Sequence, residues 1–253
     1  MIARSRDLSG GAARLDQALV ERGLATSRAR ARDAILRGHV RVDGTPAVKP
    51  SLTVGPRNAI SIDDPAAAYV SRGALKLAAA LDAFGYDPAG CTALDIGAST
   101  GGFTQVLIER GAVRVFAVDV GHGQLDPRLA RDPRLVSREG LNARDLTPAD
   151  IGEPLGAIVA DVSFIPLRLV LPPALALASG GAWLVALVKP QFEVGRGHVG
   201  KGGIVRDVAV ARQAAADVAA WLTDAGWLVD GVIDSPIAGG DGNREFLLGA
   251  RRG

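Results

Sequence analysis

The stretch TALDIGASTGGFTQVLIERG, residues 92–111, constrains the fold of this chain more than any other. An apolar run reaches Asp95, a loop with glycines at 97, 101 and 102 follows, and an amphipathic pattern of helical spacing comes next. Glycine has no Cβ and adopts dihedral angles that other residues avoid, so such a loop lets a ligand touch the backbone. The stretch therefore predicts a strand, a ligand-binding turn and a helix.

Short apolar runs alternate with helical patterns over most of the remaining chain. After the first strand, further strands are expected within residues 114–121, 134–140, 157–164 and 183–190. This alternation is typical of a doubly wound, largely parallel sheet of the Rossmann-like α/β class. A long helical pattern at 208–226 precedes two runs, 227–237 and 242–250, that predict a closing antiparallel pair.

Residues 169–188 carry no charge and have the nominal length of a membrane span. Two adjacent prolines and a Ser-Gly-Gly interrupt them where a spanning helix must be continuous. We therefore expect a short helix, a Gly-Gly turn and a buried strand instead of a span.

Residues 14–63 predict a separate small α+β unit, with two helices followed by a short sheet. Residues 1–60 carry a net charge of +6, whereas the remainder carries −4. A basic unit on an acidic body is suited to a polyanion such as RNA, although a solubilising face explains the charge equally well. The predicted division is an N-terminal tail (1–13), this unit (14–63), a linker (64–69) and the α/β domain (70–253).

The composition excludes some classes of protein. Hydrophobic residues make up 48% of the chain, which excludes a disordered protein. A single cysteine, Cys91, excludes an intramolecular disulfide framework, and the N-terminus has no apolar core of signal-peptide length. These features predict a cytoplasmic protein, and no metal site is expected.

The spacing of the glycine loop indicates its ligand. It lacks the Gly-Lys-Ser/Thr of a triphosphate loop and the G-x-G-x-x-G of a dinucleotide site. An acid followed by a wider glycine loop suits S-adenosylmethionine, and Asp119 ends the next strand, where a carboxylate accepts ribose hydroxyls. The alternative is an ordinary strand–helix turn. The candidate cofactor residues are Asp95, Gly97, Ser99, Gly101, Gly102, Phe103, Asp119, Asn142 and Asp161.

Four ionisable residues at or near strand ends are candidates for catalysis: Lys76, Asp161, Lys189 and Glu245. The chain has only four lysines against 25 arginines, and a lysine can lose its proton whereas a guanidinium cannot. Methyl transfer to a ribose hydroxyl requires a group that orients the hydroxyl and accepts its proton. The alternative is that the four form plain ion pairs, Lys76 with Asp161 and Lys189 with Glu245.

Residues 70–247 resemble the FtsJ-related, TlyA-type ribosomal RNA 2′-O-methyltransferases, notably in LDIGASTGGFT, ADVSFIPL, LVKPQFEVG and GNREFLL. Residues 14–62 are similar to a small RNA-binding domain named after a ribosomal small-subunit protein. The resemblance implies methyl transfer from S-adenosylmethionine to a cytidine ribose in the RNA of ribosomal subunits. It also places a Lys-Asp-Lys-Glu catalytic tetrad on the four residues above.

Within that scheme Lys189 activates the hydroxyl, Asp161 orients it near the sulfonium, and Lys76 and Glu245 hold the network and substrate. The candidate RNA-binding residues are Arg14, Arg28, Arg30, Arg37, Arg41 and Arg72. The glycine-rich segment 195–207 is either a loop that orders on RNA or a mobile connection. Three rival functions remain: a non-catalytic RNA-binding or ribosome-assembly factor, a haemolysin, and a small-molecule methyltransferase.

Overall fold

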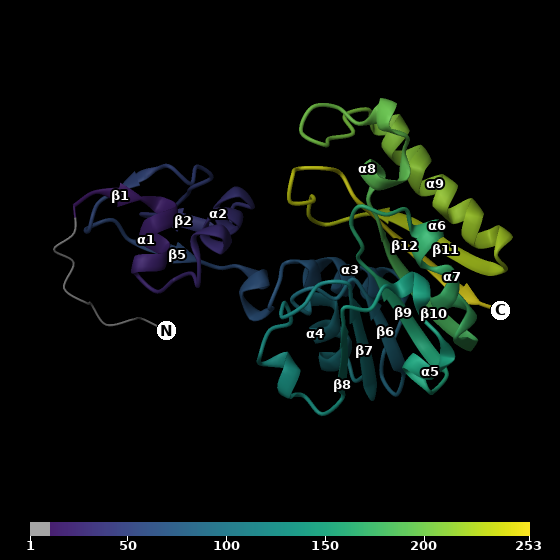
Figure 1. Ribbon diagram of the computed structural model, residues 1–253. Coiled ribbons are helices and arrows are strands. Elements are labelled where there is room, and N and C mark those ends of the chain that lie inside the picture. Colours follow the sequence, from purple (N-terminus) through teal and green to yellow (C-terminus); the bar gives the residue numbers. More distant parts are fainter. Residues whose placement is uncertain (1–10) are drawn as a thin grey trace. The chain divides into compact units, whose positions relative to one another are not determined.

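The structure of the protein is a computed structural model that describes residues 11–253 (Figure 1). The chain folds into two units, Met1–Ala67 and Ala68–Gly253, each with its own apolar interior. Of the predicted N-terminal tail, residues 1–10 lie outside the described residues.

The first unit has the two helices that its sequence predicts, but its short strands form two sheets, of two and three strands, instead of one. Ser27 caps the second helix by accepting a hydrogen bond from the backbone N–H of Arg30, and Asp43–Gly44 make a hairpin turn with positive φ at both residues. One apolar core joins the helices to both sheets. The elements are β1 (Ala13–Arg14), α1 (Leu15–Glu21), α2 (Arg28–Leu36), β2 (Val40–Val42), β3 (Thr45–Pro46), β4 (Thr53–Val54), β5 (Ile60–Ile62) and η1 (Pro65–Ala68).

The second unit contains a seven-stranded sheet in the order β11-β12-β10-β9-β6-β7-β8. Strands β6 to β10 run parallel, and β12 is antiparallel to both β10 and β11, which confirms the predicted closing pair. The chain fills the sheet outward from β6 on one side and then returns to β9 on the other. Ligands of such sheets bind beyond the carboxyl ends of the strands at this reversal. The strands are β6 (Thr92–Ile96), β7 (Arg114–Asp119), β8 (Leu135–Glu139), β9 (Leu155–Ala160), β10 (Ala178–Val188), β11 (Trp227–Asp234) and β12 (Phe246–Arg252).

Helices cover both faces of this sheet. One apolar cluster joins α3 and α4 to one face, and a larger cluster joins α6, α7 and α9 to the other, where α9 lies along β11 (Figure 1). This arrangement is the Rossmann-like α/β class that the sequence predicts. The helices are α3 (Gly73–Phe84), α4 (Gly102–Glu109), η2 (Leu129–Arg131), η3 (Ala143–Asp145), α5 (Pro148–Ile151), α6 (Leu167–Val170), α7 (Pro172–Ala176), α8 (Pro190–Glu193), η4 (Arg196–His198) and α9 (Val208–Asp224).

The uncharged stretch 169–188 differs in detail from its prediction. The two prolines open α7, where the missing N–H groups have no helical partner to lose. The Gly-Gly segment lies inside β10 and accompanies a shift of register between Ala178 and Trp183, with Gly181 at φ 76°. It is therefore a bulge, not a turn before the strand. Within residues 11–253, none of the helices combines the length and apolar character that crossing a membrane requires.

Candidate active site

The glycine loop after β6 lies against the end of β9. Gly97 has φ 81°, and a Cβ there would overlap the backbone carbonyl oxygen of Asp161. Gly101 caps α4 with φ 95°, and its Cβ would overlap the side chain of Leu129. Both positions therefore require glycine, and the loop exposes backbone at the reversal of the strand order.

Asp95 is the second-last residue of β6 and is fully buried, with Oδ2 accepting a 2.6 Å hydrogen bond from Thr104 Oγ1. Its other oxygen, Oδ1, has no hydrogen-bond partner among the described residues. Burial is the main cause that raises the pKa of Asp95 to about 7; the hydrogen bond from Thr104 opposes the rise, and the nearby Asp161 carboxylate adds to it. An unsatisfied buried carboxyl beside a glycine loop fits the acid that the cofactor prediction places here.

Asp119 ends β7, as predicted, and points back to the loop. Its Oδ2 accepts the backbone N–H of Ser99 at 2.8 Å, and its Oδ1 accepts that of Gly121 at 2.7 Å. Ser99 has φ 47°, so the loop is held in an unusual conformation by this carboxylate. Half-buried Asn142 caps η3 through the N–H of Arg144, and Phe103 is buried in the core beneath α3.

The four predicted catalytic residues form two ion pairs, with partners opposite to those expected. Lys76 Nζ lies 2.5 Å from Glu245 Oε2, with the side chains 7% and 3% exposed. Lys189 Nζ lies 2.6 Å from Asp161 Oδ1, with the side chains 12% and 24% exposed. The expected pairs, Lys76 with Asp161 and Lys189 with Glu245, are therefore wrong.

The topology explains the pairing. Asp161 and Lys189 directly follow the adjacent parallel strands β9 and β10, so their side chains meet at one edge of the sheet. Lys76 lies on α3, which packs against β12, and Glu245 directly precedes that strand. The second turn of α3 thus brings Lys76 to Glu245, one helical turn after Gly73, which lies beside Asp161 Oδ2.

The amine of Lys189 has one further neighbour. It donates a 2.9 Å hydrogen bond to Ser163 Oγ, whereas its contact with Asp161 is an ion pair without hydrogen-bond alignment. The backbone N–H of Asp161 donates to Ile96 O at 2.9 Å, which fixes the backbone of Asp161 against β6. An ammonium group has three N–H donors, so the arrangement leaves Lys189 capacity for a substrate oxygen.

Phe164 is a feature that the sequence does not reveal. Its side chain is 90% exposed, its φ is 67°, and its ring lies 5.0 Å from that of Phe192, tilted by 49°. A left-handed conformation at a bulky residue is strained and marks a position fixed by its surroundings. Phe164 follows Asp161 by three residues, so an aromatic face stands beside the lysine–carboxylate pair.

Comparison with known proteins places these residues in a family. Residues 69–252 match the family model of FtsJ-like methyltransferases, and residues 13–60 match the S4 domain. The 16S/23S rRNA (cytidine-2′-O)-methyltransferase TlyA of Mycobacterium tuberculosis is 50% identical over 240 residues, covering 94% of this chain and 90% of that protein. The chain is a TlyA-type FtsJ-like methyltransferase.

Solved structures agree with this family. A candidate haemolysin from Streptococcus thermophilus superposes with a TM-score of 0.74 at 38% identity, covering 96% of this chain and 89% of that one. The N-methyltransferase NodS of Bradyrhizobium japonicum, solved with S-adenosyl-L-homocysteine, has a TM-score of 0.50 at 18% identity, covering 71% and 84%. The second likeness shows the fold alone. The predicted family and fold class are therefore confirmed.

The predicted RNA-binding arginines differ in how far their charges are already satisfied. Arg14 makes a bidentate contact with Asp16, which Arg28 also approaches at 3.4 Å. These cations lower the pKa of Asp16 to about 2 against the effect of its burial. The side chain of Arg37 is 13% exposed and binds both Asp33 and Asp64, so its charge is already paired within the first unit.

The other three predicted arginines lie on α2, on β2 and directly before α3. Arg30 donates to Ala66 O at 3.5 Å, and Arg41 donates to Gly44 O at 3.0 Å on the exposed hairpin. Arg72, in the second unit, is the residue directly before α3, and its guanidinium lies near Gly240. Five of the six arginines therefore lie in the first unit and one in the second.

The glycine-rich segment 195–207 is hydrogen-bonded to the segment that carries Glu245. Gly200 and Ile204 are joined by a 2.9 Å backbone hydrogen bond, and Gly203 donates back to Gly200. Asn243, almost fully buried, accepts from Val205 N–H at 3.0 Å and donates to Gly203 O at 2.9 Å. Asn243 is not among the candidate site residues, although it stands two residues before Glu245.

Proposed function

We propose that this protein transfers a methyl group from S-adenosylmethionine to the 2′-hydroxyl of a cytidine in the RNA of ribosomal subunits. The observation that carries this proposal is the Lys189–Asp161 pair, which stands beside the glycine loop at the reversal of the strand order. We place the activity in the cytoplasm, where ribosomal subunits are assembled.

Residues at this edge fit the proposed cofactor. Gly97 and Gly101 leave room that a Cβ would fill, the buried Asp95 keeps an unsatisfied oxygen, and Asp119 stands at the end of the neighbouring strand. Carboxylate oxygens accept hydrogen bonds from an amino group and from ribose hydroxyls, both of which this cofactor carries. When bound, S-adenosylmethionine supplies a methyl group on a positively charged sulfonium.

We assign the lysine–carboxylate pairs to the part of the site that receives the nucleophile, the 2′-hydroxyl of the RNA. Lys189 Nζ is held by Asp161 and Ser163. We assign the neutral amine form of Lys189, which has a lone pair, to accept the proton of the 2′-hydroxyl. Asp161 fixes the direction of the amine next to the cofactor loop. The buried pair Lys76–Glu245 holds α3 to the segment before β12.

We assign RNA binding to residues 14–63, a linker to 64–69 and methyl transfer to 70–253. A net charge of +6 over residues 1–60 favours contact with phosphates, and exposed arginines bind RNA without reading its sequence. Phe164 adds an aromatic face on which an unpaired base stacks. The basic unit and the aromatic face favour RNA over a small-molecule acceptor.

The test is transfer of tritium from labelled S-adenosylmethionine to purified ribosomal subunits that lack this methylation. Wild type is compared with Lys189→Ala and with Lys189→Arg, which keeps the charge but cannot accept a proton. We expect label in RNA from the wild type, loss of at least about 100-fold in both variants, and unchanged cofactor binding. A folded wild type that labels neither subunit nor naked RNA would instead indicate an RNA-binding factor.

A further inference from the structure

Two loops that leave adjacent strands carry most of the proposed nucleophile site. The loop from β9 to α6 holds Asp161, Ser163 and Phe164, and the segment from β10 into α8 holds Lys189 and Phe192. The ion pair and the ring contact both bridge these two loops. Their relative position therefore determines where the amine of Lys189 points.

A third bridge lies behind the site. Glu193, the last residue of α8, accepts the backbone N–H of Leu167, the first residue of α6, at 2.8 Å through Oε1. Leu167 is fully buried, and burial raises the pKa of Glu193. The N–H groups in the first turn of a helix have no partner within the helix, so this carboxylate caps α6 from another element.

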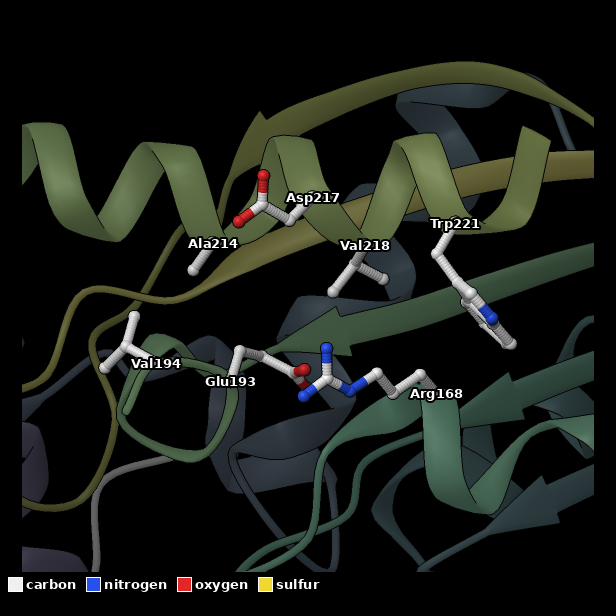
Figure 2. Close-up of a pocket in the computed structure, with 7 residues that line it drawn as sticks. All are labelled: Arg168, Glu193, Val194, Ala214, Asp217, Val218 and Trp221. Carbon is white, nitrogen blue, oxygen red and sulfur yellow. The ribbon is translucent and has the colours of Figure 1, made fainter. Parts of the chain in front are cut away.

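Figure 2 shows the surroundings of this bridge. Glu193 and Arg168 point toward one another beside a cavity of about 140 Å³ that α9 covers with Val218 and Trp221. Arg168 belongs to α6 and Glu193 to α8, so the charges on the two short helices also attract each other. The two helices are thus held together at their far side from the ion pair.

We propose that Glu193 is a positioning residue, which fastens α8 to α6 and thereby sets the direction of Lys189 toward the substrate hydroxyl. Glu193 does not touch the reacting atoms. It acts through the four residues of α8, which directly follow Lys189 in the chain. Loss of the bridge frees α8 to shift relative to Asp161, and a displacement near 1 Å is sufficient to slow a reaction about 100-fold.

The test compares three substitutions in the full-length protein. Glu193→Ala removes the acceptor, and Glu193→Gln keeps an oxygen of the same reach. Asp150→Ala is the matched control, because Asp150 caps the equally short α5, accepting from Thr147 N–H at 2.8 Å before β9 begins. That position lies at the opposite end of β9 from Asp161.

We expect kcat on ribosomal RNA to fall at least about 10-fold in Glu193→Ala, with KM for S-adenosylmethionine unchanged. Glu193→Gln should stay within about 3-fold of wild type, and Asp150→Ala should lose a similar amount of thermal stability without loss of kcat. Equal losses of kcat in Glu193→Ala and Asp150→Ala, or no rescue by glutamine, would overturn the inference.

The kcat readout rests on the proposed function, so a second measurement addresses the bridge itself. Hydrogen exchange of the Leu167 amide should be slow in wild type and in Glu193→Gln, and much faster in Glu193→Ala. If wild type transfers no methyl group, the proposed function fails, and this exchange still tests the bridge. Equal exchange at Leu167 in all three proteins would refute it.

Discussion

The two ion pairs differ in burial, and this difference predicts that breaking them lowers stability by different amounts. Glu245→Ala leaves the ammonium of Lys76, only 7% exposed, without its partner at 2.5 Å. Breaking a buried pair in this way costs about 3–5 kcal/mol, because the remaining charge is neither hydrated nor paired. At about 2–4 °C per kcal/mol for a unit of this size, the melting temperature should fall by roughly 10 °C.

Lys189→Ala should cost far less. Its partner Asp161 is 24% exposed, so water partly replaces the lost ammonium and the penalty is expected near 1 kcal/mol. Replacing both members of the buried pair, as Lys76→Met with Glu245→Leu, should recover most of the stability, since apolar pairs of similar volume commonly equal buried ion pairs.

Urea unfolding followed by tryptophan fluorescence measures these values, because all three tryptophans lie in the second unit. We expect Glu245→Ala to be at least about 2 kcal/mol less stable than Lys189→Ala. We also expect the apolar double variant to be stable but slow in methyl transfer. Equal costs for the two single variants, or a double variant as unstable as Glu245→Ala, would refute it.

Three further outcomes follow from the site. Since the folded-state pKa of Asp95 is raised to about 7, its neutral form stabilises the protein at low pH, and this stability is lost as pH rises from ~4 through 7. Asp95→Asn should therefore gain up to ~4 kcal/mol at pH 8 and little at pH 4 by urea unfolding, and an equal effect at both pH values would contradict the assignment. Gly97→Ala should abolish cofactor binding in calorimetry and cost ~2–4 kcal/mol, whereas Gly123→Ala, with φ 64° and open space around it, should cost only ~1 kcal/mol; similar costs would count against the close approach to Asp161. Phe164→Gly should relieve strain of ~1 kcal/mol yet weaken kcat/KM for RNA by ~1–3 kcal/mol, and unchanged kinetics would exclude base stacking.

Features that depend on neighbouring residues in the chain can be predicted from this sequence. The positions of Gly97, Gly101 and Asp119 follow from a strand–loop–helix pattern, and the structure places all three at one edge of the sheet. The alternation of strands and helices likewise gives the α/β class. Each of these inferences needs only local periodicity and the residues that end a strand.

Features that depend on packing between distant segments cannot be predicted in the same way. The partners within the tetrad follow from the adjacency of β9 and β10 and from the packing of α3 on β12, which the order of residues does not specify. The left-handed backbone of Phe164 and the bridge from Glu193 to Leu167 also leave no periodic pattern. Arg37 appears in the sequence as one more surface cation, although two carboxylates bind it.

The most direct test of the central claim is the chemical identity of the methylated product. Ribosomal subunits treated with the protein and S-adenosylmethionine are digested to nucleosides, which are separated and identified by mass spectrometry against untreated subunits. The account predicts 2′-O-methylcytidine as the nucleoside that increases, and no increase with Lys189→Ala. Methylation of a base, methylation of another nucleoside, or no methylation at all would contradict a site built to activate a cytidine ribose hydroxyl.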